Sequence, residues 1–297
     1  MAVRSGVLPV LAAAVLWGTV GPAQLLADTG ADPVALGAGR MLLGGAVLCA
    51  VAVRARGLRS LRGREVPAWL LLSVLVTALF QAAFLQAVDR TGAALATAVA
   101  FGTVPAVSGL CARLLQREPL SARWCAGTVV AVAGTGFLLL PGSGGRADLV
   151  GVLLAAVAGA SFGVYIVATK RLAAAGGDPA TAAPVAVLCA GLLVSPWLVA
   201  HPAGLGEPRA LVLLAWLALG TTAAGYLLFT AGLARISAAT TSTLSLAEPL
   251  VAVVLGLVLL GERPSGWSGL GMALLLSGLL VVSLPVRRRE QPLAGTA

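Results

Sequence analysis

Charged residues are scarce in this sequence. Asp, Glu, Lys and Arg make up 10% of its 297 residues, 59% are hydrophobic, and the mean hydropathy is +0.99. A water-soluble domain carries about 25% charged residues, because its surface must stay hydrated. The composition therefore excludes a soluble domain and indicates an integral membrane protein.

Cysteine and histidine are also rare. The four cysteines, Cys49, Cys111, Cys125 and Cys189, lie within or at the ends of apolar segments, and their spacing fits no disulfide framework or zinc motif. We interpret them as small buried thiols. The single histidine, His201, has no neighbouring histidine or acid. We therefore expect no metal site.

Two further features are missing from the chain. It contains no Gly-rich phosphate-binding loop, and no hydrophilic stretch is long enough to form a domain that holds ATP. These absences argue against a pump driven by ATP hydrolysis, and we expect no cofactor.

Long apolar segments dominate what is present. About 20 apolar residues are needed to cross a bilayer as a helix, whereas barrel strands are shorter and alternate in polarity. The sequence predicts an all-α membrane protein with ten spans, whose approximate ranges are 7–27, 33–53, 66–88, 92–112, 122–140, 149–169, 180–200, 210–233, 237–260 and 266–286.

Basic residues are divided unequally between the two sides of these spans. With the N-terminus in the cytoplasm, fifteen Lys and Arg side chains are cytoplasmic, four are outside and one, Arg40, is inside a span. Cytoplasmic links carry such an excess. We therefore expect a multi-pass protein of the plasma membrane with both termini cytoplasmic. The net charge of +9 then reflects topology and contact with membrane lipids, so we expect no nucleic-acid partner.

An internal repeat organises the chain. At a shift of 144 residues, Pro105 matches Pro249, Glu118 matches Glu262, and both Gly127 and Gly134 match glycines, Gly271 and Gly278. We expect a first five-helix unit over 7–141, a second over 147–286, and a basic cytoplasmic tail over 287–297. Because five is odd, the second unit enters the membrane inverted, as in many secondary transporters.

These residues resemble those of a known family. Trp17-Gly18, Arg40, Pro105 with Glu118, and Glu248-Pro249 with Gly261-Glu262 are similar, in this order, to EamA-type drug/metabolite transporters. The resemblance covers about 7–285 as two EamA domains. It implies a ten-helix carrier that exports amino acids, metabolites or drugs, often in exchange for protons. Val104 occupies the position that matches Glu248, so only one half carries the acid.

Two formally charged residues lie well inside the spans. Arg40 and Glu248 fall within roughly 5 Å of each other in depth at 1.5 Å per residue. Charges at this depth are costly and usually face a cavity and a partner. Arg40 presents a planar fork suited to the carboxylate of a substrate, whereas Glu248 can gain and lose a proton. A structural ion pair between the two halves is the alternative interpretation.

Other polar and aromatic residues at similar depth complete the candidate site. A hydroxyl in a membrane helix often bonds a backbone carbonyl instead of a ligand, and Trp17 could equally fill the core. The further candidates for substrate binding or coupling are Trp17, Gln81, Tyr165, Thr222, Tyr226, Thr241 and Ser245.

The favoured function is export of a small metabolite, such as an amino acid, by alternating access, with protons as one option for the coupling ion. The alternatives are an exporter of cationic drugs and, more remotely, a membrane enzyme acting on lipid-linked substrates. The short links offer few acid or base residues for such chemistry, so we do not expect an enzyme. Gly and Ala faces could pack helices within one chain or in a homodimer.

Overall fold

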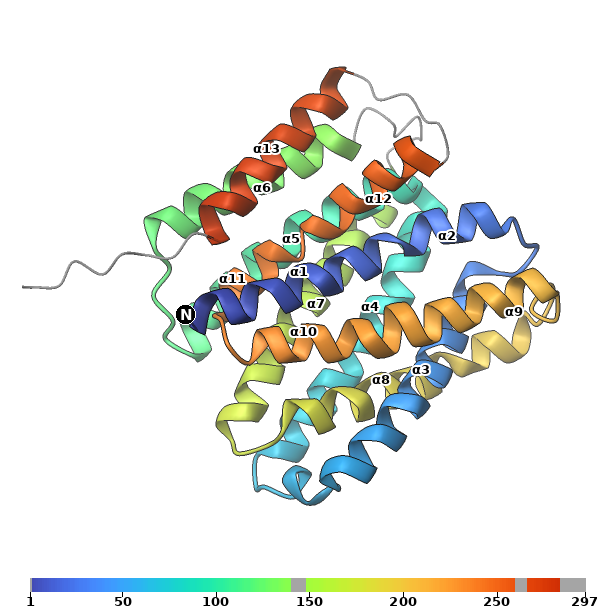
Figure 1. Ribbon diagram of the computed structural model, residues 1–297, viewed down its shortest axis with the longest axis horizontal. Helices are drawn as coiled ribbons and strands as arrows, with labels where there is room; N and C mark the ends of the chain where they lie inside the picture. The colour runs from blue at the N-terminus through green and yellow to red at the C-terminus, as the bar shows by residue number, and fades with distance from the viewer. Residues whose placement is uncertain (1, 140–147, 260–265, 284–297) are drawn as a thin grey trace, which may run out of the picture.

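The computed structural model describes residues 2–139, 148–259 and 266–283, and all regular structure within them is helical (Figure 1). The helices are α1 (Ala2–Gly18), α2 (Val20–Ala27), α3 (Pro33–Arg56), η1 (Arg59–Leu61), α4 (Val66–Thr91), α5 (Ala93–Leu115), α6 (Ala122–Leu139), α7 (Leu149–Ala174), α8 (Pro179–Ala200), α9 (Pro208–Ala215), η3 (Trp216–Ala224), α10 (Gly225–Leu233), α11 (Ala238–Leu244), α12 (Ala247–Leu259) and α13 (Gly266–Ser283).

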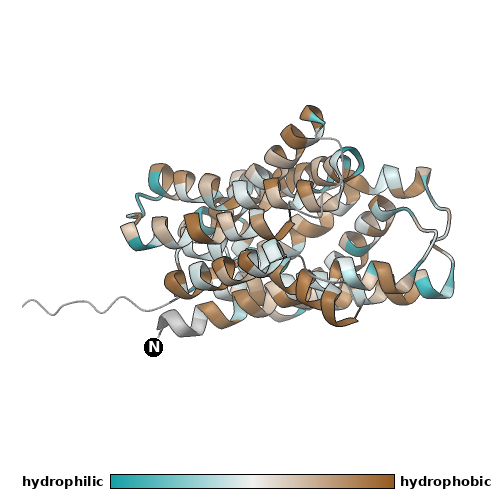
Figure 2. Ribbon diagram, turned by 90° about the horizontal axis from the view of Figure 1, so that it is seen from above, coloured by the Kyte–Doolittle hydropathy of each residue, from teal (hydrophilic) through white to brown (hydrophobic). Residues whose placement is uncertain are grey.

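The described residues contain ten helical stretches that are long and apolar enough to cross a membrane. This number and the all-helical fold confirm the sequence-based prediction. Several spans begin at a proline in the first helical turn, as in α3 and α8, where an aspartate also caps the free backbone N–H groups. Hydrophobic residues make up most of the helices along the middle of the bundle, and hydrophilic residues gather toward its two ends (Figure 2), as a bilayer requires.

Two of the spans are broken helices, and each break lies four residues before a proline. Pro249 has no N–H to donate to the carbonyl of Ser245, and the N–H of Glu248 donates to that carbonyl instead, at 3.0 Å. This separates α11 from α12. Pro22 stands in the same relation to Gly18, where α1 ends before α2. The break in the ninth span therefore lies on the N-terminal side of Pro249.

The two breaks lie against each other. A Cβ built on Gly18 would lie 2.8 Å from the carbonyl oxygen of Glu248 and 2.7 Å from the Cβ of Val251. Only a glycine permits this approach between α1 and the start of α12. The discontinuities in the first and ninth spans therefore meet inside the bundle, as in transporters built from broken helices.

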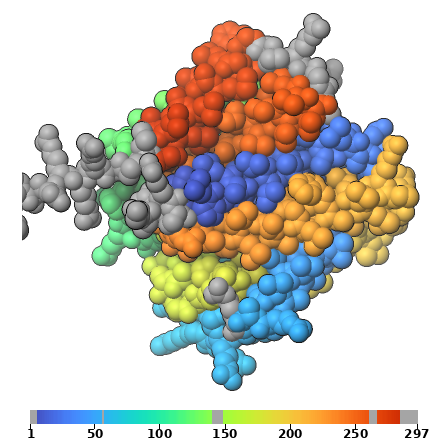
Figure 3. Space-filling view, in the orientation of Figure 1, coloured from blue at the N-terminus to red at the C-terminus, as the bar shows by residue number. Residues whose placement is uncertain are grey.

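Helix pairing follows the expected internal symmetry. The α1–α10 contact joins spans one and eight, and its counterpart, α4–α7, joins spans three and six. The pairs α3–α8, α5–α11 and α6–α13 each join a span to its own equivalent in the other unit. Figure 3 shows α13, α12, α1 and α10 side by side across one face, so the two units interleave. The unit boundaries that we expected from the repeat stay a prediction.

The α6–α13 pair is held by the glycines of the repeat. A Cβ on Gly127 would lie 3.1 Å from the carbonyl oxygen of Gly278, and one on Gly134 would lie 2.9 Å from that of Gly271. Backbones can approach this closely only where side chains are absent. The matched positions of the two copies therefore contact each other crosswise.

The interpretation of the cysteines as buried thiols is wrong in part. All four are free, as expected, but Cys125 is exposed and the other three are only partly buried. They lie on helix faces turned toward the surface, where a small apolar thiol suits a lipid environment.

Candidate functional site

One face of α3 carries the basic member of the site. Gly37, Arg40 and Gly44 are spaced by three and four residues, so they share this face. The amide group of Gln81 from α4 packs against Gly37, and the side chain of Thr222 from η3 packs against Gly44. The two glycines thus let α4 and η3 approach α3 closely, one turn before and one turn after Arg40.

Glu248 and Tyr226 face the same region. Both interact electrostatically with Arg40, and all three side chains lie deep in the bundle while keeping part of their surface accessible. Across the described residues, Arg40 and Glu248 form no ion pair within 4.0 Å. The two opposite charges therefore attract each other at a separation longer than a contact ion pair.

Aromatic rings from three spans surround this region. The ring of Trp17 lies 5.6 Å from Tyr226, 6.0 Å from Phe162 and 5.1 Å from Phe229, and Tyr165 lies 6.2 Å from Tyr226. Tilted and edge-to-face rings at these separations attract one another. The predicted residues Trp17, Tyr165 and Tyr226 are therefore in one cluster.

One buried hydroxyl group in the candidate set lacks a hydrogen-bond partner. It belongs to Thr222, which is 1% exposed, and the ring of Tyr165 nearby is 2% exposed. The carboxamide of Gln81 is 5% exposed. A buried polar group without a partner costs roughly 1–3 kcal/mol, so its retention calls for an explanation.

The structure places Thr241 and Ser245 differently from the rest. Both are fully buried, and their hydroxyls donate to the carbonyls of Ser237 and Thr241 at 2.9 Å and 3.1 Å. This is the alternative that the sequence left open for a hydroxyl in a membrane helix. Their bonds support the short α11 segment next to its break.

Family comparison agrees with this architecture. The family model described as the EamA-like transporter family matches residues 4–140 and again residues 149–284. The chain belongs to the EamA-like transporter family.

Individual relatives of this EamA-family chain are transporters by name. It is 38% identical over 287 residues to the uncharacterized transporter YwfM of Bacillus subtilis, covering 95% of this chain and 94% of that protein. It is 33% identical over 177 residues to the threonine/homoserine exporter RhtA of Salmonella typhimurium, covering 59% of each protein. One solved crystal structure has the same fold, with a TM-score of 0.81, 25% identity, and coverage of 94% of this chain and 96% of that one.

Several features of the EamA-family site were missed in the sequence. Phe162 and Phe229 join the aromatic cluster, and their mid-span positions, which drew attention to Trp17, were the available signal. The π-helical turn η3 was also missed. Its backbone accepts the indole N–H of Trp17 at the Thr221 carbonyl, 2.8 Å away, while the indole of Trp216 donates to the hydroxyl of Thr19 at 3.1 Å.

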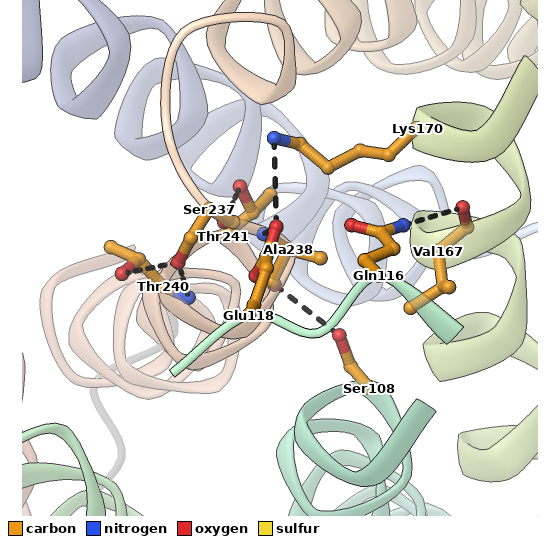
Figure 4. A network of polar contacts seen from close by, with 9 residues as sticks. All are labelled: Ser108, Gln116, Glu118, Val167, Lys170, Ser237, Ala238, Thr240 and Thr241. Carbon is orange, nitrogen blue, oxygen red and sulfur yellow. Dashed lines mark hydrogen bonds and ion pairs between the residues drawn. The ribbon is translucent and has the colours of Figure 1, made fainter. Parts of the chain in front are cut away.

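Glu118, one of the two matched glutamates of the EamA repeats, tethers a helix end. Its Oε1 accepts from the backbone N–H of Ala238 at 3.5 Å and lies 3.9 Å from the ammonium of Lys170 (Figure 4). Glu262 lies outside the described residues. No cluster of three or more potential metal ligands occurs in the described ranges.

Proposed function

We propose that this protein exports small zwitterionic metabolites, of the threonine and homoserine type, by alternating access. The observation that supports this most directly is the arrangement of Arg40 and Glu248. Opposite charges stand near each other in the membrane interior, both partly accessible and without a contact pair. Such charges are costly in a membrane unless a ligand or a partner uses them.

The two charges suit the two ends of an amino acid. The guanidinium of Arg40 can donate two parallel hydrogen bonds to a carboxylate. The carboxylate of Glu248 and the nearby rings of Trp17 and Tyr226 can receive an ammonium group, through charge and through cation–π attraction. The buried hydroxyl of Thr222, which has no partner in this structure, offers a contact for a polar side chain of the substrate.

Glu248 is also the group that couples transport to a proton in this proposal. Protonation of its carboxylate removes the attraction to Arg40 and to the ammonium of the substrate, which favours release. With both termini in the cytoplasm, protons would enter the site from outside while the substrate leaves. The name of the RhtA exporters supports the direction and the substrate class, although the alignment spans 59% of their length.

Counterflow in proteoliposomes tests the proposal. Vesicles loaded with unlabelled L-threonine should accumulate labelled L-threonine through the wild type. Arg40→Ala should lower this rate at least tenfold, because a charge-assisted bidentate contact of about 1.5–3 kcal/mol is lost. Arg40→Lys should recover part of the rate. The exposed Arg64 provides a matched control, since Arg64→Ala should leave the rate unchanged.

The role of Glu248 has its own readout. Glu248→Gln keeps the size and hydrogen-bonding capacity of the side chain but cannot titrate. Exchange should continue only at a higher threonine concentration, about tenfold for one lost charge-assisted contact, while accumulation driven by a pH gradient should be lost. Accumulation that still follows the pH gradient in Glu248→Gln would contradict proton coupling at this residue.

A second candidate function is export of cationic aromatic compounds, which the ring cluster beside Glu248 favours. In that case exchange would occur with cationic dyes, depend on Glu248, and be insensitive to Arg40→Ala. The same set of variants therefore separates the two candidates.

A further inference from the structure

A cavity lies away from the central Arg40–Glu248 site, at the end of the bundle that holds the N-terminus. It has a volume of 390 Å³ and is lined by the α5–α6 link, the end of α7 and the end of α10. Its charged lining residues are Glu118, Lys170 and Arg171. Ligand pockets of roughly 300–1,000 Å³ hold small molecules, so the volume suits an amino acid.

The contacts of Glu118 are few and long. One oxygen, Oε1, takes both the 3.5 Å hydrogen bond from Ala238 and the 3.9 Å ion pair with Lys170, whereas Oε2 is buried and has no partner. A carboxylate has about four acceptor positions, and a tight pair with Lys would be about 2.8 Å long. Figure 4 shows Glu118 and Lys170 pointing toward each other from different elements. Glu118 therefore keeps acceptor capacity for another cation.

The basic side chains of the cavity, like Glu118, have hydrogen-bonding positions that no protein group fills. Lys170 is 23% exposed and has a single loose acidic partner. The guanidinium of Arg171 stacks over the ring of Trp69 at 5.4 Å, and its Nε is buried without a hydrogen-bond acceptor. Lys170 is also the one lysine of the chain, all other basic residues being arginines apart from His201.

We propose that this cavity, here called the Glu118 cavity, is a second binding site for zwitterionic amino acids. The ammonium group of the ligand donates to Oε2 of Glu118, and its carboxylate accepts from Lys170 and Arg171. The Glu118–Lys170 contact opens as the ligand inserts between the two charges. This inference rests on the proposed function for its ligand class, and it places a capture step before the central Arg40–Glu248 site.

The single lysine makes the test specific. Reductive methylation of the full-length protein with ¹³C-formaldehyde leaves the charge of Lys170 in place and gives one lysine signal in the NMR spectrum, beside that of the N-terminal amine. Addition of L-threonine should shift the lysine signal saturably and leave the N-terminal signal unmoved. Threoninamide and N-acetylthreonine, which each lack one charge, should shift it only at about tenfold higher concentration, as expected for one lost charge-assisted contact.

Variants separate this site from the central one. Glu118→Gln should raise the threonine concentration for half-saturation about tenfold. Glu65→Gln, which alters an exposed carboxylate, should leave it unchanged. Arg40→Ala, which disables the central site, should leave the Lys170 titration intact. A transport assay on Lys170→Met and Lys170→Arg adds a functional readout: KM for substrate offered on this side should rise in the first and recover in the second.

Two results would overturn the proposal. One is a Lys170 signal that does not move with saturating threonine in a protein that carries out threonine counterflow. The other is a shift that disappears in Arg40→Ala, because Lys170 would then report binding at the central site. Failure of counterflow with a preserved Lys170 titration would instead reject the proposed transport function and retain the Glu118 cavity as a binding site.

Discussion

At the scale of single residues, glycines determine which side chains reach the site. Gly37 and Gly44 flank Arg40 on α3, and each receives a polar side chain from a neighbouring helix. A larger residue at either position would push Gln81 or Thr222 away from the face of α3 that carries Arg40. The site thus depends on two residues that have no functional group of their own.

Gly44→Ala tests this dependence. The added Cβ would lie 2.5 Å from the carbonyl oxygen of Ala218 and 2.8 Å from the Cβ of Thr222, distances that require α3 and η3 to separate. We expect a loss of stability of about 1–3 kcal/mol, the usual cost of overpacking. Thermal unfolding of the purified protein in detergent measures it.

A glycine elsewhere provides the matched control. A Cβ added to Gly269, within α13, would meet no neighbouring heavy atom within 4 Å, so alanine there points into open space. Gly269→Ala should be neutral or slightly stabilising, since alanine favours the helix. Equal melting temperatures for Gly44→Ala and wild type would show that α3 and η3 are not held at close contact.

At the scale of secondary-structure elements, the two proline breaks are the features that distinguish α1–α2 and α11–α12 from ordinary spans. They meet at Gly18, beside the backbone of Glu248. A helix with a missing hydrogen bond bends more easily at that place than a continuous one. The acid of the candidate site therefore sits at the break in its own span.

Pro249→Ala should restore the missing N–H and allow a continuous helix from α11 into α12. We expect an unchanged or higher melting temperature together with slower counterflow, because the repaired helix resists bending. Pro184→Ala is a suitable control, since Pro184 is also inside a helix, α8, but away from the break. Counterflow that is as fast in Pro249→Ala as in wild type would contradict a role for the break in transport.

The sequence predicts features that depend on neighbouring residues, and it misses features that depend on contacts between distant residues. The ten spans follow from local hydrophobicity, and Arg40, Tyr226 and Glu248 stand out because polar groups are rare at mid-depth. The π-helical turn η3 could not be predicted, because its geometry is tied to an indole bond from Trp17, about 200 residues away. Thr241 and Ser245 looked like ligands because a composition pattern does not show which hydroxyls bond their own helix.

At the scale of the whole molecule, the two five-helix units complete each other. The first unit supplies α1 and α4, and each packs against a helix of the second unit, α10 and α7. Neither unit contains both members of these pairs. The interface between the units is therefore the centre of the protein and also the place of the candidate site.

Division of the chain between the units tests this arrangement. We expect that residues 1–143 or residues 144–297 expressed alone are degraded or aggregate, because each exposes the faces that pack against the other. Expression of both pieces together should restore a complex that co-purifies and shows counterflow. Stable, monodisperse folding of either piece alone would contradict the interleaved packing as the source of stability.

The crosswise contacts of Gly127 with Gly278 and of Gly134 with Gly271 are made by matched positions of the two copies. An antiparallel pair of identical five-span units would form the same seam, but every substitution in such a pair would alter both sides at once. Because this chain carries both copies itself, one side can differ from the other. Val104 and Glu248 differ in this way: an acid lies in one half and an apolar residue at the matching position of the other.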